Sequence, residues 1–170
     1  EAAALDVGGT VYRPFPTGGF DIARRLRDMD AAGFDMHVLS ATPQTYLYDQ
    51  DAALTVITAA IQNDQIAKHI AAHPARFLGI ATLPMQDAKR AADELRRAMT
   101  KLGLRGAMIG SHVYERNLDD PGFEPLWATA EELGAFLFIH PVNVAGADRL
   151  KSYYLQNLIG NPLDTTIAAA

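Results

Sequence analysis

The chain contains four short runs of apolar residues, at about 36–40, 77–81, 105–109 and 135–140. A brief apolar run bounded by turn residues predicts a strand that is buried in a parallel sheet. The last run is the clearest, because five apolar residues stop at His140 and Pro141 follows at once. Proline cannot donate to a strand ladder, so we expect this strand to end there.

Helical periodicity fills the segments between these runs, and capping residues indicate where each helix begins and ends. Six helices are expected. They lie between Asp21 and Gly33, over about 51–72, from Asp87 to Gly103, from Asp120 to Gly134, over about 148–159, and from near Pro162 onward. In the longest of them, Leu54, Ile57 and Ile61 are expected to form the apolar face, with Ile66 and Ile70 as further candidates. Residues 1–20 contain glycine and proline without periodicity and are interpreted as loop.

Strands that alternate with helices predict an α/β fold with a parallel sheet and right-handed crossovers. An open doubly wound sheet would usually carry a glycine-rich phosphate loop after its first strand, and none of these strands is followed by one. This favours a (β/α)8 TIM barrel, which needs about 250 residues and eight strands. With 170 residues and four strands, the chain is expected to be a partial barrel.

His140 is the first candidate for chemistry, because βα-barrels place metal ligands and catalytic groups at the C-terminal ends of their strands. The alternative is a histidine that caps the strand by bonding a nearby carbonyl group. Position alone leaves both interpretations open.

Composition narrows the choice of function. The chain has no cysteine, which excludes disulfides, thiolate metal ligands and a cysteine nucleophile. Its net charge is −5 with scattered basic residues, so nucleic acid is not an expected partner. No apolar run approaches the roughly 20 residues that span a bilayer, and no signal peptide is visible, so we expect a cytoplasmic protein without a membrane partner. The chain begins at Glu1 and ends in alanines of an expected helix, so we interpret 1–170 as one partial domain, truncated at both ends.

Several sequence fragments occur together in one order along the chain. They are Tyr12 to Pro14, Met29 to Asp35 followed by Ala41 to Pro43, Leu83 to Asp87, Ile109 to His112 followed by Leu118 to Asp120, Ile139 to Pro141, and Asn161 to Thr166. In this order they resemble the amidohydrolase-related metal-dependent decarboxylases of the aminocarboxymuconate-semialdehyde decarboxylase type. The resemblance implies a TIM barrel with one divalent metal, usually zinc, at its C-terminal mouth. It also implies that this chain supplies about strands two to five.

The resemblance assigns expected roles to four residues. His140 matches the metal ligand that ends the fifth strand. Arg13 matches an arginine that binds a substrate carboxylate, for which the planar guanidinium is suited. His112 is placed at the mouth as a substrate contact, and its alternative is a loop histidine without a role. Asn157 matches a position of a substrate-contacting aromatic residue, where asparagine would replace stacking by hydrogen bonding.

The resulting prediction is a decarboxylase that acts on an aromatic or unsaturated carboxylic acid once the barrel is complete. The alternatives are a metal-dependent hydrolase of a lactone or amide, and a non-catalytic half-barrel. The family's remaining ligands, an H-x-H pair and an aspartate, have no match here, and a catalytic zinc takes three protein ligands. We therefore expect the chain alone to be inactive and to bind no metal tightly. A small carboxylic acid is the expected partner, and a homo-oligomer is possible.

Overall fold

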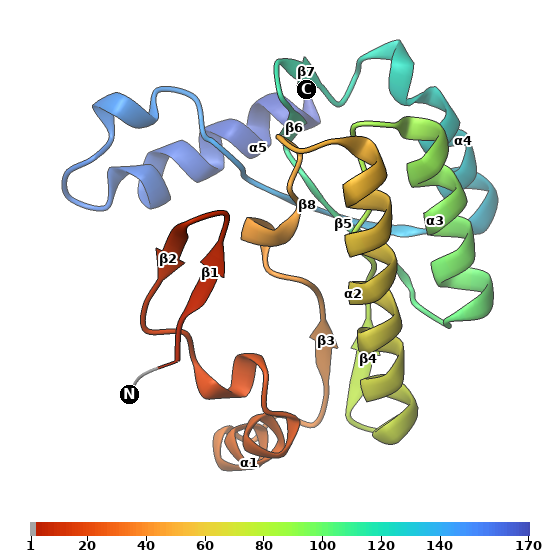
Figure 1. The fold of residues 1–170 in the computed structure, drawn as a ribbon. Coiled ribbons are helices and arrows are strands. Elements are labelled where there is room, and N and C mark those ends of the chain that lie inside the picture. The colour runs from red at the N-terminus through yellow and green to blue at the C-terminus, as the bar shows by residue number, and fades with distance from the viewer. Residues whose placement is uncertain (1–2) are drawn as a thin grey trace.

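Four parallel strands form the centre of the computed structural model, which describes residues 3–170 (Figure 1). They are β3 (His37–Leu39), β4 (Phe77–Gly79), β5 (Gly106–Gly110) and β8 (Phe136–His140). Each falls within one residue of a predicted apolar run.

The strands are neighbours in sequence order. β3 pairs with β4 from His37 opposite Phe77, and β5 pairs with β8 over five residues, ending at Gly110 opposite His140. The middle pair is joined by a parallel bridge between Ala81, just after β4, and Ala107. The predicted adjacency of four parallel strands is therefore confirmed, as is the α/β class.

Within residues 3–170, five α-helices accompany the strands: α1 (Ile22–Ala32), α2 (Ala52–Ala72), α3 (Ala88–Lys101), α4 (Glu124–Leu133) and α5 (Asn161–Ala169). Figure 1 shows α2, α3 and α4 together on one side of the strands, as a barrel requires. The aspartates at 21, 51 and 87 cap α1, α2 and α3 by accepting backbone N–H groups. No helix among residues 3–170 is long and apolar enough to cross a membrane.

The core lies between this helix layer and the strands. The face of α3 that the periodicity predicted is buried, with Ala91, Leu95 and Ala98 fully enclosed. Phe77 of β4 and Ile109 of β5 pack into the same cluster. Burial of this continuous apolar surface fixes the helices against the strands.

The apolar face predicted for α2 is wrong in the first half of the helix. Leu54, Ile57 and Ile61 are exposed there, and the buried face carries Thr55, Ala59 and Asn63 instead. Further along the helix, Ile66 is buried as expected and Ile70 packs against the core. The helix has apolar residues on opposite sides, so the periodicity of the sequence was compatible with burial of either face. The hydrogen bonds of the buried Asn63 to Thr82 are formed only by the inward orientation that the structure adopts.

Residues 1–20 were expected to form a loop, but part of this segment forms a β-hairpin. Residues 1–2 lie outside the described part of the chain. β1 (Leu5–Val7) pairs antiparallel with β2 (Thr10–Tyr12). Gly8 and Gly9 connect them with φ of 57° and 86°, as a two-residue type I′ turn requires. The Gly-Gly pair was the signal that a sequence interpretation could have used. A 3-10 turn, Thr17–Gly19, precedes α1.

The helix expected at 148–159 is not formed as one element. A 3-10 turn covers Ala147–Arg149, and a π-helical turn covers Gln156–Gly160. Between them Tyr153 and Tyr154 adopt φ of 57° each, which a right-handed helix cannot contain. The side chains of both tyrosines are exposed.

Three further short elements lie in connections. The turns Pro43–Thr45 and Pro121–Phe123 are 3-10 helices that lead from β3 and into α4. After β5 the chain forms a small antiparallel hairpin of β6 (His112–Val113) and β7 (Arg116–Asn117).

Candidate active site

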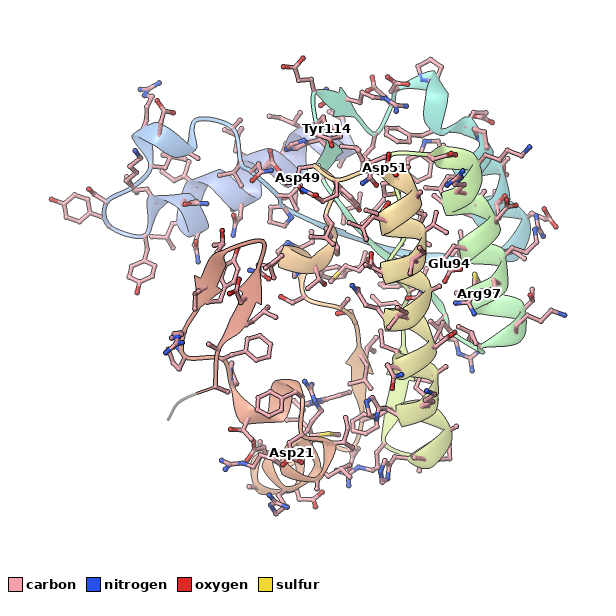
Figure 2. The ribbon with its side chains drawn as sticks, viewed as in Figure 1. Asp21, Asp49, Asp51, Glu94, Arg97 and Tyr114 are labelled. Carbon is pink, nitrogen blue, oxygen red and sulfur yellow. The ribbon has the colours of Figure 1, made fainter. Side chains whose placement is uncertain are left out.

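An open cavity of about 1040 Å³ lies at the C-terminal ends of the parallel strands. Its walls come from the β1–β2 hairpin, the loop that follows β3, the β6 hairpin and the segment after β8. Figure 2 shows Asp49 and Tyr114 at this end of the structure, and both line the cavity. Because these walls come from separate loops above parallel strands, the cavity lies where barrel enzymes build their sites.

His140 ends β8 and lines this cavity. Its Nδ1 lies 2.8 Å from the carbonyl oxygen of Pro141, so the Nδ1–H group donates to that oxygen. The ring then keeps a lone pair on Nε2, which is the arrangement that metal-binding histidines use. His140 thus bonds a nearby carbonyl group, as the capping alternative stated, and still has a nitrogen available as a ligand.

His140 also borders a second cavity of about 470 Å³. Ser40 and Ala41, at the end of β3, and Met108 of β5 line it as well. The histidine therefore lies between two hollows above the strand ends.

His112 is brought into the same cavity as His140, but both of its ring nitrogens are occupied. Nδ1 lies 2.6 Å from the carbonyl oxygen of Tyr114, and Nε2 lies 2.8 Å from that of Val142. Since a neutral imidazole has one N–H group, both contacts are satisfied only when each nitrogen carries a proton. No ring N–H remains for a bound molecule in this arrangement. Contact of the His112 ring with a substrate stays a prediction.

Arg13 and Asn157 are exposed and are not among the residues that line the cavity. Their chain neighbours Tyr12 and Gln156 do line it. The structure does not place these two side chains in the cavity wall, and their predicted contacts with a substrate stay predictions.

Two tyrosines that the sequence interpretation passed over also line the cavity. The rings of Tyr46 and Tyr48 stack with centroids 5.2 Å apart, and Tyr48 Oη accepts the N–H of Gly110 at 3.1 Å. Burial raises the pKa of Tyr46 far above its usual value, and the neighbouring Tyr48 raises it further. Burial also raises the pKa of Tyr48, so both hydroxyl groups stay neutral. Their position directly after the turn that ends β3 was the available signal.

Metal-binding side chains do not gather elsewhere in the described residues. Over 3–170 no group of three or more His, Asp or Glu side chains could hold a metal ion. His140 is consequently a single candidate ligand rather than part of a complete site within this stretch.

Comparison with known proteins identifies the family. The family described as Amidohydrolase matches residues 11–166, which is most of the chain. The chain belongs to the amidohydrolase family. The predicted resemblance is thereby confirmed.

Relatives named as decarboxylases match most of the chain. The 2-amino-3-carboxymuconate-6-semialdehyde decarboxylase of Dictyostelium discoideum is 36% identical over 166 residues, covering 98% of this chain and 46% of its own length. The gamma-resorcylate decarboxylase of a Polaromonas strain is 33% identical, covering 74% of this chain and 40% of its own length. The chain therefore spans less than half the length of these relatives.

A solved structure agrees with these sequence matches. The 5-carboxyvanillate decarboxylase of Sphingomonas paucimobilis superposes with a TM-score of 0.78 at 36% identity, over 86% of this chain and 44% of that one. The dihydroxybenzoic acid decarboxylase of a Polaromonas strain, solved with bound manganese and an inhibitor, gives a TM-score of 0.76 at 29% identity, over 86% and 47%.

Proposed function

We propose that the complete protein is a metal-dependent decarboxylase that releases carbon dioxide from an aromatic or unsaturated carboxylic acid. The observation that carries the proposal is the position of His140, which ends a parallel strand at a cavity with Nε2 free. The decarboxylase activities of the relatives of this chain support it.

In this proposal β3, β4, β5 and β8 are strands two to five of a TIM barrel. His140 Nε2 is one metal ligand, and residues beyond those described supply the others, since a catalytic site needs about three protein ligands. When bound, a divalent metal such as manganese or zinc polarises a substrate oxygen or activates a bound water. Manganese is bound in two solved relatives, whereas the family resemblance implied zinc.

The residues of this chain would bind and orient the acid. Arg13 would hold its carboxylate through two parallel N–H···O bonds, which lysine cannot reproduce. The stacked Tyr46 and Tyr48 would form one wall with neutral hydroxyl groups. Asn157 would offer a hydrogen bond in place of an aromatic face.

The test is product analysis of the complete protein, reconstituted with Mn²⁺ or Zn²⁺ in turn. Gamma-resorcylate, 5-carboxyvanillate and a small lactone would be supplied separately, and carbon dioxide and ring-opened acid would be measured. We expect carbon dioxide from at least one aromatic acid and no ring opening. His140→Ala should abolish the release, which shows that the protein itself is responsible.

Ring opening of the lactone without release of carbon dioxide would establish the hydrolase alternative. A complete protein that binds neither metal and turns over no substrate would instead identify a non-catalytic module.

A further inference from the structure

The peptide group between Pro141 and Val142 orients the ring of His140. Its carbonyl oxygen accepts from His140 Nδ1 at 2.8 Å, and its N–H donates to Ser111 Oγ at 3.1 Å. A peptide unit is planar, so fixing the direction of its N–H also fixes the direction of its carbonyl oxygen. Ser111 therefore holds the same rigid group to which the His140 ring is bonded.

Ser111 is itself fixed by contacts on two sides. Its backbone N–H donates to the carbonyl oxygen of His140 at 2.9 Å. Its hydroxyl group donates to the carboxylate of Asp164, which lies on α5. A serine hydroxyl has one proton, so donation to Asp164 leaves its oxygen lone pairs for the N–H of Val142.

Ser111 and Asp164 are both buried, at 2% and 6% exposure. The next residue, His112, holds the following carbonyl group, that of Val142, through Nε2. Two consecutive residues thus hold successive peptide groups of the segment after β8: Ser111, which lies between β5 and β6, and His112 of β6. Water has little access to replace the Ser111 contact, so its loss leaves the peptide free to rotate.

We propose that Asp164, Ser111 and the Pro141–Val142 peptide form a relay that positions the His140 ring for metal binding. Asp164 orients the Ser111 hydroxyl, Ser111 orients the peptide, and the peptide carbonyl fixes the His140 ring with Nε2 directed away from it. Partners of this kind hold ligand side chains in many metal sites. Ser111 and Asp164 are positioning residues and make no contact with the metal.

The metal part of this inference rests on the proposed function, and its test uses the complete protein. Mn²⁺ would be titrated into the metal-free protein by calorimetry. We expect Ser111→Ala to weaken Mn²⁺ binding about 10- to 100-fold, the usual cost of losing such a partner. Asp164→Ala should weaken it in the same direction, and Asp164→Asn should restore part of the loss, because the amide oxygen still accepts from Ser111.

Ser152→Ala is the matched control, because Ser152 is exposed and lies in the loop between β8 and α5. It should bind Mn²⁺ as the unaltered protein does. Unchanged Mn²⁺ affinity in both Ser111→Ala and Asp164→Ala, with circular dichroism showing that the variants are folded, would overturn the relay.

A second measurement does not need the metal. In the metal-free protein the Val142 amide should be protected from hydrogen exchange, and Ser111→Ala should speed its exchange at least tenfold. An equal rate in both proteins would refute the relay whatever the metal result. If the unaltered protein binds neither Mn²⁺ nor Zn²⁺ but the Val142 amide responds as expected, the hydrogen-bonded relay stands and the proposed function fails.

Discussion

Asn63 is the residue whose replacement tests the fold most directly. It is fully buried on α2, and its side chain bonds both backbone groups of Thr82, which follows the end of β4. Nδ2 donates to the Thr82 carbonyl oxygen at 3.0 Å, and Oδ1 accepts the Thr82 N–H at 2.9 Å. Nδ2 also donates to Glu94 of α3 at 2.6 Å, and Figure 2 shows Glu94 and Arg97 together on that helix. One side chain therefore joins α2, α3 and the end of β4.

The expected cost of Asn63→Ala follows from these contacts. Two buried backbone groups of Thr82 lose their partner, at about 1–3 kcal/mol each. Glu94 adds little, because it keeps the guanidinium of Arg97 at 2.8 Å. The better helix propensity of alanine returns about half a kcal/mol. The free energy of unfolding should therefore fall by about 2–5 kcal/mol.

The assay is urea unfolding of the complete protein, followed by circular dichroism. The midpoint should drop while the slope stays the same, which indicates a change in stability alone. Gln65→Ala, at an exposed position of the same helix, should change the free energy of unfolding by less than about 0.5 kcal/mol. A loss below about 1 kcal/mol for Asn63→Ala would refute the reasoning, since it would mean that the Thr82 groups find other partners.

Three further predictions concern the candidate site and the electrostatics. Arg13→Lys in the complete enzyme should raise KM for the acid about tenfold or more, because a bidentate contact is lost; unchanged KM and kcat would exclude Arg13 as the carboxylate-binding residue. His140→Ala should abolish both metal binding and turnover in the complete protein. The 170-residue chain should hold no metal after dialysis, with or without this substitution, and about one equivalent of metal in the unaltered chain would contradict this. The side chain of Arg116 and the N–H of Gly122 lower the pKa of the Asp120 carboxyl below its usual value. The stabilising effect of the charged carboxylate is therefore present above the usual pKa and disappears as the pH falls through the lowered one. An NMR titration should show this pKa rising in Arg116→Gln, and an unmoved titration curve would show that Arg116 is not its cause.

The sequence by itself determined the elements whose causes are local. The apolar runs at about 105–109 and 135–140 became paired strands, because a short run of apolar residues has few other ways to be buried. Asp21 and Asp87 cap helices by bonding N–H groups three residues ahead, which requires no distant partner. The position of His140 at a strand end follows from the same local pattern.

Tertiary structure decided which of two possible faces a helix buries and how a site is oriented. On α2 the face with the apolar Ile57 and Ile61 is exposed, and the face that carries Asn63 is buried. Only this orientation brings the Asn63 amide to Thr82, 19 residues away.

The orientation of the His140 ring likewise depends on Ser111, and Ser111 depends on Asp164, 53 residues further along the chain. Hydrogen bonds between residues so distant in sequence leave no periodic pattern. They form only when packing brings the strand ends and α5 together, so the sequence located the histidine and the fold determined the direction of its ring.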